Sequence, residues 1–168
     1  MAEAKPKYAA SAAITCTLTS LADGGYRESA GVNNTTNRYM DALVGGSIQV
    51  GAVTADGTIS VFAYGSADAG GIYSGGLAGT DETITWGTTP ASSSVEGFNQ
   101  LKLLGVISVD TTDDNNDIEF AGFSVAAAFG GVMPEKWGIV VLNETGVALN
   151  ATGTNNEIHY QGITYESV

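Results

Sequence analysis

The chain has 168 residues and a mass of 17.1 kDa, which suits one domain, and only 14% of its residues are charged, against roughly 25% in typical soluble domains. Its 18 Asp and Glu against six Lys and Arg give a formal net charge of −12, which argues against nucleic-acid partners and acidic membrane surfaces. The single cysteine, Cys16, and single histidine, His159, exclude an intrachain disulfide and zinc sites built on Cys/His clusters.

The N-terminal segment and the apolar stretches of the chain match no targeting or membrane signal. Residues 1–8 contain two lysines and lead into mixed Ala, Ser and Thr, unlike the continuous apolar core of a secretory signal. The longest apolar run, residues 125–133, includes two glycines, whereas a transmembrane helix needs about 20 apolar residues. We expect residues 1–10 to form a flexible N-terminal arm, which either lies on an acidic neighbour or is a disordered terminus. Residues 11–168 are expected to form a single domain.

Apolar and polar residues alternate with a period of two along most of the chain, and this alternation predicts β-strands. In residues 13–19, Ile14, Cys16 and Leu18 are separated by threonines, which suit a pleated, half-buried strand. Residues 124–129 are the only segment typical of a helix, of one or two turns. The further predicted strands are 38–44 (a helical turn is the alternative), 47–50, 58–64, 82–86, 101–109, 117–123, 136–142 (buried on both faces) and 157–165.

Turn signals between these strands predict how neighbouring strands are joined. Asp56-Gly57 stands between two alternating runs and predicts a hairpin, because Asp-Gly tolerates positive φ. Long loops rich in Gly, Ser and Asn are expected over residues 23–37, 65–80 and 87–99. The pattern predicts an all-β fold, an antiparallel β-sandwich or a barrel.

Residues suited to nucleophilic or phosphate chemistry do not form a recognisable motif. His159 is predicted in the middle of a strand, and the chain has no Gly-x-Ser-x-Gly elbow. Cys16 shares a strand face with aliphatic residues, which indicates an inert core thiol. The glycine-rich run 70–79 lacks the Lys-Ser/Thr ending of a phosphate-binding loop. The sequence therefore predicts neither an enzyme nor a cofactor, although a carboxylate pair for glycoside hydrolysis would be a tertiary arrangement that no motif announces.

The acidic run 110–119 contains the best metal candidate in the sequence. Asp113, Asn115 and Asp117 match the opening of a calcium loop, in which alternate oxygen-bearing side chains face one ion. Ile118 stands where that loop requires glycine, and Ser124 stands where it requires a bidentate glutamate. We therefore interpret the run as a solvated hairpin turn, with a calcium site as the alternative.

Five segments of the chain carry a resemblance to a family of small virion structural proteins of tailed bacteriophages. They are ITCTLTSL (14–21), RESAGVNNTTN (27–37), FSVAAAFGGVMPEKWGIVV (123–141), NETGVAL (143–149) and IHYQGI (158–163). The resemblance covers most of the chain after the first ten residues. It implies an eight-stranded jelly-roll β-sandwich that acts as a non-enzymatic capsid decoration (cement) protein. Such a protein is made in the host cytoplasm, binds the major capsid protein on the capsid surface of the virion and commonly forms a homotrimer.

Two other functions compete with capsid decoration. The first is a different virion role, as a tail, vertex or fibre-base structural protein. The second is a carbohydrate-binding β-sandwich module, in which Trp86 or Tyr73 would stack on a sugar ring. A glycan hydrolase or lyase with a catalytic carboxylate is a more distant alternative.

Overall fold

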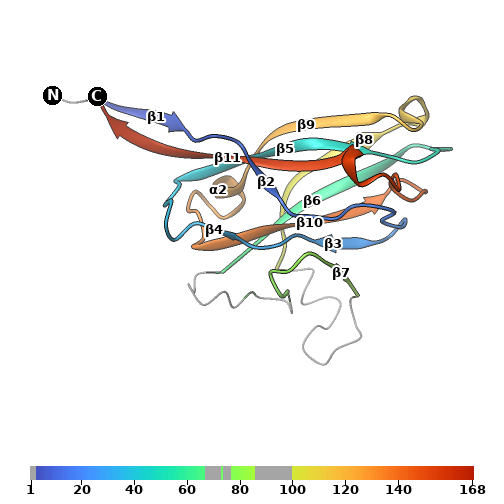
Figure 1. Ribbon diagram of the computed structural model, residues 1–168, viewed down its shortest axis with the longest axis horizontal. Helices are drawn as coiled ribbons and strands as arrows, with labels where there is room; N and C mark the ends of the chain where they lie inside the picture. The colour runs from blue at the N-terminus through green and yellow to red at the C-terminus, as the bar shows by residue number, and fades with distance from the viewer. Residues whose placement is uncertain (1–2, 67–72, 74–76, 86–99) are drawn as a thin grey trace.

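The computed structural model describes residues 3–66, 73, 77–85 and 100–168. Two antiparallel β-sheets pack face to face in this part of the chain (Figure 1), which confirms the predicted all-β sandwich. No helix among the described residues is long and apolar enough to cross a membrane.

The first sheet, called sheet A here, runs in the order β1-β11-β5-β9, and β2 also pairs with β11. Its strands are β1 (Ala4–Tyr8), β2 (Ala12–Ile14), β5 (Asp41–Gln49), β9 (Asp117–Ser124) and β11 (Asn156–Ser167). The second sheet, sheet B, runs in the order β7-β3-β10-β6-β8, and β4 also pairs with β10. Its strands are β3 (Tyr26–Glu28), β4 (Val32–Asn33), β6 (Gly57–Ser66), β7 (Glu82–Ile84), β8 (Lys102–Val109) and β10 (Lys136–Glu144).

The early strands pair with the late strands in reverse order along the chain. Strand β2 pairs with β11, β3 with β10, β5 with β9 and β6 with β8, all antiparallel. Successive strand pairs therefore alternate between the two sheets: β2–β11 and β5–β9 lie in sheet A, and β3–β10 and β6–β8 lie in sheet B. In the part of the chain that the structure describes, the short elements between strands are the 3-10 turns η2 (Thr111–Asp113) and η3 (Gly153–Asn155) and the helix α2 (Val125–Ala128). The position of α2 confirms the helical prediction for 124–129.

The predicted hairpin at Asp56-Gly57 is wrong, because the strands on either side of it lie in different sheets. Gly57 does not adopt the positive φ on which the hairpin signal depends; it pairs with Val109 as the first residue of β6. Strand β6 is buried along most of its length, so it belongs in the interior of sheet B between β10 and β8. The polar run after β8 likewise crosses from sheet B to sheet A instead of closing a hairpin.

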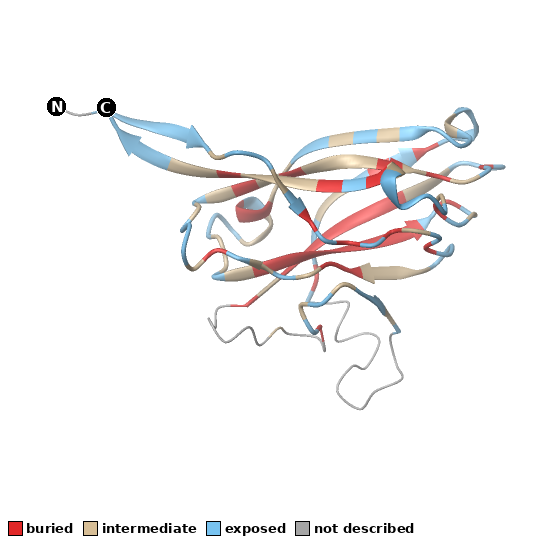
Figure 2. Ribbon diagram, viewed as in Figure 1, coloured by how far each residue is buried: buried red, intermediate tan, exposed pale blue. Residues whose placement is uncertain are grey.

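The main core fills the space between the sheets, as the buried segments in Figure 2 show. Trp137 of sheet B has no exposed surface, and its ring meets the ring of Tyr160 from sheet A edge-on at 5.3 Å between centroids. Tyr160 also contacts Tyr39 edge-on at 6.5 Å. Other core side chains from both sheets are Val44, Ile48, Ile158, Ile59, Val61, Ile139 and Val141.

A second apolar cluster covers the outer face of sheet B. Val140 and Leu142 of β10 lie on this face with Phe62 and Tyr64 of β6. Leu77 and Leu101, from the connection between β6 and β8, close over them. Strand β10 is therefore buried on both faces, as predicted for residues 136–142.

Several predicted segments differ from the structure in their extent. The strands predicted over 38–44 and 47–50 form one strand, β5, and the loop predicted over 23–37 contains β3 and β4. The strand predicted over 13–19 ends at Ile14, because the Thr17 N–H and hydroxyl donate to the Asp81 carboxylate and not to a neighbouring strand. Residues 1–10 were expected to be a flexible arm, whereas Ala4–Tyr8 forms β1 and pairs with the last residues of β11. This two-stranded ribbon projects past the end of the sandwich (Figure 1), and at its tip Glu3, the first described residue, is hydrogen-bonded to the C-terminal Val168.

Candidate interaction surface

The calcium candidate lies in the acidic link between β8 and β9, where hydrogen bonds hold its side chains to the turn itself. Asp110 caps η2 by accepting from the Thr112 N–H at 2.7 Å, and the Asp113 carboxylate accepts from the Asp110 N–H at 2.8 Å. The bonds from Thr112 hold the pKa of Asp110 below its ordinary value. Asn115 has a φ of 53° and donates its side-chain amide to Asp114 at 2.8 Å.

Asp117 begins β9 opposite Gln49, so the structure places all three candidate residues in one exposed link. The Gln49 amide donates to the Asn115 carbonyl oxygen at 2.7 Å, a further bond that ties the link to β5. Within the described residues, no group of three or more His, Cys, Asp or Glu side chains is placed to hold a metal ion.

Millimolar calcium is expected to leave the melting temperature unchanged relative to EDTA, because the Asp113 and Asn115 side chains already bond within the turn. Differential scanning calorimetry with and without calcium measures this. A calcium-dependent rise in melting temperature that Asp113→Asn abolishes would show instead that the link opens to bind the ion.

Cys16 and His159 both line a hollow of about 320 Å³, but Cys16 is buried whereas His159 is partly exposed. Burial raises the pKa of the Cys16 thiol to about 12, with a further contribution from the Asp81 carboxylate, so the thiol stays protonated and inert at neutral pH. His159 is partly exposed on the outer face of sheet A, with Nε2 3.3 Å from the Glu157 carboxylate. It borders a shallow hollow of about 470 Å³ that is also lined by Gly46, Ser47, Glu119, Phe120, Ala121 and Glu157.

Of the two residues proposed to stack on a sugar, Tyr73 and Trp86, the structure describes Tyr73. The Tyr73 ring packs edge-on against Tyr64 at 5.0 Å between centroids and joins the second apolar cluster. It also lies against Gly31 and Gly79, where a Cβ atom would collide with it. Tyr73 is therefore committed to internal packing, and Trp86 lies outside the described residues.

A buried carboxylate, Glu28, lies beneath the connection between β6 and β8. The sequence pattern does not identify it as a special residue. Its side chain is 1% exposed and accepts from the backbone N–H groups of Gly79 at 2.5 Å and Ala78 at 3.2 Å. Burial raises the pKa of Glu28, although the two N–H groups oppose that shift. The neighbouring Tyr64 hydroxyl donates to the Ser29 carbonyl oxygen at 2.7 Å, which fixes the ring beside the carboxylate.

A second polar contact holds Asp81, two residues after Gly79, against sheet B. Arg27 donates from Nε to Asp81 at 2.7 Å, and the Thr17 N–H donates to the same carboxylate at 2.9 Å. Burial alone would raise the pKa of Asp81, but the bonds from Arg27 and Thr17 outweigh burial and hold that pKa below its ordinary value. Both polar contacts join β3 of sheet B to residues 77–85 of the connection between β6 and β8, called the covering segment here. Both contacts therefore have a structural role.

The projecting ribbon of β1 and β11 separates apolar from charged side chains on its two faces. Residues opposite each other in an antiparallel pair share a face, and alternate residues return to it. The register Pro6↔Tyr165 and Tyr8↔Ile163 therefore places these four side chains on one face. The other face holds the charged side chains Lys5, Lys7 and Glu166, with Lys7 3.0 Å from Glu166.

The apolar ribbon face continues the outer face of sheet A. Along β11, Ile158 is buried and Tyr160 packs against the core, so the odd-numbered residues between and beyond them face outward. His159 is one of these, and Ile163 and Tyr165 extend the same row onto the ribbon. All five residues of β1 are exposed, and Tyr8 and Tyr165 are 55% and 63% exposed.

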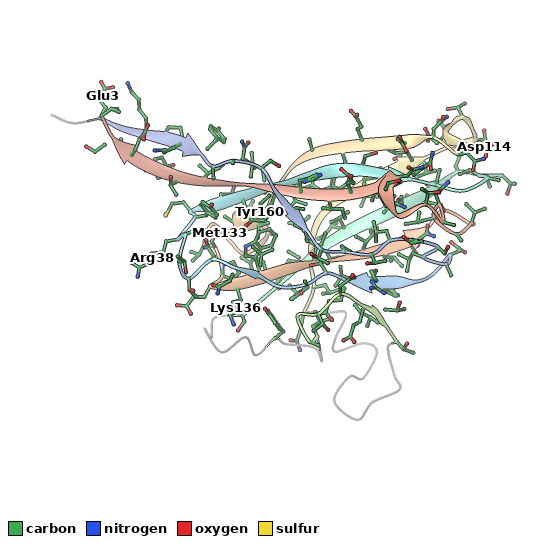
Figure 3. All side chains as sticks on the ribbon, in the orientation of Figure 1. Glu3, Arg38, Asp114, Met133, Lys136 and Tyr160 are labelled. Atoms are coloured by element: carbon green, nitrogen blue, oxygen red, sulfur yellow. The ribbon has the colours of Figure 1, made fainter. Side chains whose placement is uncertain are left out.

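The two ends of the sandwich differ in charge. In Figure 3, Glu3, Arg38 and Lys136 lie toward the ribbon end and Asp114 lies at the opposite end. Strand pairings gather other links at the Asp114 end, because Gly57 pairs with Val109 and Glu144 with Thr58. Its acidic residues are Asp23, Asp56, Asp110, Asp113, Asp114, Asp117 and Glu144.

Comparisons of the chain with protein-family models, with curated protein sequences and with solved structures return no match.

Proposed function

We propose that the chain is a non-enzymatic virion structural protein, a decoration (cement) protein that binds major capsid protein subunits and stabilises a bacteriophage head. The exposed apolar face of the β1–β11 ribbon is the observation that carries a binding role. Contiguous exposed apolar surface in a folded protein indicates an interaction site, because its exposure to water is energetically unfavourable and a partner that covers it is favoured. The resemblance in sequence supplies the virion context.

The strand pairing supports the finer fold assignment that this role implies. A jelly roll has eight strands in two packed sheets built from Greek keys. If the short β4 and β7 and the extension β1 are set aside, sheet A reads β2-β11-β5-β9 and sheet B reads β3-β10-β6-β8. This order is consistent with a jelly roll and supports our proposal that the chain has that architecture.

The internal contacts of the loops also favour a rigid binding body. Glu28 and the Arg27–Asp81 pair tie the covering segment to sheet B, and the second apolar cluster lies beneath it. Tyr73, one of the two residues of the sugar-binding hypothesis, takes part in that cluster and so is not a free stacking platform. Binding is therefore assigned to the ribbon and the adjoining sheet face.

Copy number in the virion tests the proposal. Purified particles from the source of the sequence would be analysed by quantitative mass spectrometry, with the major capsid protein as internal reference. We expect roughly equimolar amounts, or three copies per local three-fold position, because a decoration protein follows the symmetry of the shell. A handful to a few dozen copies per particle would move the chain to the tail, vertex or fibre base, and absence from the particle would overturn a virion role.

A further inference from the structure

Strand β8 forms one edge of sheet B, and one side of its backbone has no neighbouring strand. It is eight residues long and pairs with β6, whereas β9, the next strand along the chain, belongs to sheet A. Among the described residues, only those of β6 form backbone hydrogen bonds with β8. The outward N–H and C=O groups of β8 are therefore available to a further strand.

The other sheet edges in the described part of the chain carry features that oppose such pairing. In β1, Pro6 lacks the N–H that a ladder needs and lies between Lys5 and Lys7. In β9, Asp117 and Glu119 place charges along the edge. Strands β2, β4 and β7 are at most three residues long. Proline, charged side chains and short strands are common means of preventing edge-to-edge pairing.

Residues 105–109 of β8 have none of these features. Their sequence is GVISV, and the one charged residue of the strand, Lys102, stands at its first position. They pair with β6 in unbroken register, and the irregularity in this pair of strands lies before them, at Leu104. A regular, uncharged and largely β-branched run is the kind of edge to which an extended chain adds.

The exposed side chains beside this edge indicate which side chains an added strand needs. Leu103 pairs with Phe62, and Val106 pairs with Ser60, which alternates with Phe62 along β6. Because Phe62 belongs to the second apolar cluster, Leu103 and Val106 both lie on the outer face of sheet B. They are 54% and 49% exposed. Apolar side chains at alternate positions of an added strand would cover them.

The two ends of β8 carry opposite charges. Lys102 begins the strand and has no ion-pair partner among the described residues. Asp110 follows Val109 directly, and Asp113 and Asp114 lie in the link that follows. An antiparallel strand, the arrangement of the described pairs in sheet B, would place its first residue beside this acidic link and its last residue beside Lys102. A basic first residue and an acidic last residue therefore complement the edge.

We propose that β8 is an acceptor edge, to which an extended segment of another protein adds as an antiparallel strand with alternating apolar side chains, a basic first residue and an acidic last residue. In strand addition the main-chain hydrogen bonds supply affinity and the side chains supply specificity. A second copy of this chain is a poorer occupant, because two bodies of formal net charge −12 repel each other. The edge belongs to sheet B and the ribbon extends sheet A, so this inference goes beyond the decoration role and does not depend on it.

Amide hydrogen exchange, resolved by residue with NMR on the untagged full chain, tests whether the edge is open. Within residues 105–109, the amides directed at β6 should exchange slowly and the alternate amides rapidly. The probe is the end-capped peptide KTVTVTVE, whose valines match the face of Leu103 and Val106. Added peptide should slow the exchange of the rapid amides. Slow exchange of all these amides in the free protein would show that the edge is already covered and would overturn the inference.

A second peptide and two variants test the specificity of the contact. The peptide ETVTVTVK meets like charges at both ends of β8 and should bind roughly fivefold more weakly or less. Leu103→Lys with Val106→Lys should abolish peptide binding and keep the wild-type melting temperature, because both side chains are exposed. Tyr8→Lys with Tyr165→Lys makes the same changes at exposed ribbon residues and should bind peptide like wild type.

Three results would overturn the inference: unchanged exchange of β8 at millimolar peptide, equal binding of the two peptides, or undiminished binding to the β8 lysine variant. Analytical ultracentrifugation of the same proteins examines the competing occupant. Wild-type oligomers that the β8 lysine variant abolishes would assign the edge to a second copy and would equally overturn it. A wild type that remains monomeric while binding KTVTVTVE through β8 supports an edge reserved for another protein.

Discussion

Trp137→Ala is expected to lower the free energy of unfolding by about 3–5 kcal/mol, the range for a large aromatic removed from a core. Trp137 is fully buried, and its edge contact with Tyr160 joins the inner faces of the two sheets. Its indole Nε1 has no hydrogen-bond partner among the described residues, so the loss comes from packing. At this chain length such a loss corresponds to a fall in melting temperature of roughly 10 °C.

Denaturation followed by far-UV circular dichroism measures this, because the substitution removes one of the two tryptophans that a fluorescence assay would use. Trp137→Phe keeps a ring against Tyr160 and gives up the unpaired N–H, so it should retain much of the stability. Leu103→Ala, at a side chain 54% exposed, serves as the control and should change stability by less than about 0.5 kcal/mol. Equal losses for Trp137→Ala and Leu103→Ala would contradict the assignment of Trp137 to the centre of the core.

The alternation of residues predicts most strands well because most strands here bury one or both faces, whereas β1 is exposed throughout. Residues 58–64 and 136–142 lie within β6 and β10, and the helical segment is also found where expected. Pairing was less predictable, since it depends on which sheet each strand joins. Asp56-Gly57 matches a hairpin in local chemistry, yet the strand that follows is buried on both faces and pairs with residues about 80 positions away, such as Val140 with Phe62.

The candidate surface could be predicted only in part. The two lysines near the N-terminus indicate an arm, but its partner strand lies at the other end of the chain, with Pro6 opposite Tyr165. The alternation of Pro6 and Tyr8 with Lys5 and Lys7 is a signal that could have suggested a strand with one apolar face. The spacing of Asp113, Asn115 and Asp117 predicted oxygen ligands but not the turn hydrogen bonds that engage two of these side chains.

Glu28 shows the limit of such reasoning most clearly. In sequence it is one carboxylate among 18, between Arg27 and Ser29. Its partners are the N–H groups of Ala78 and Gly79, about 50 residues away in a segment without strand pattern. Burial of a charged group requires such bonds, and only the folded chain reveals where they come from.

Glu28→Leu is expected to lower the free energy of unfolding at neutral pH by about 2–3 kcal/mol, because backbone N–H groups lose their bonds to a charged acceptor. Glu28→Gln keeps one acceptor oxygen in nearly the same shape and should lose less. The pH dependence of the free energy of unfolding separates the effect of the Glu28 charge from that of the side-chain shape, because glutamine has nearly the same shape and does not ionise. Since burial raises the pKa of Glu28 above its ordinary value of 4.5, the folded state holds that proton more tightly than the unfolded state.

The wild type should therefore lose this part of its stability as pH rises from about the ordinary value through the raised pKa, whereas Glu28→Gln has no proton to lose. Asp81, whose pKa is held below its ordinary value, acts in the opposite direction but equally in both proteins, so the difference between them isolates Glu28. Unfolding measured at several pH values should show Glu28→Gln becoming steadily more stable relative to wild type as pH rises across this window. A difference that stays constant with pH would mean that Glu28 is not held in the buried, proton-favouring site described here, and the anchoring of the covering segment would then rest on the second apolar cluster and the Arg27–Asp81 pair.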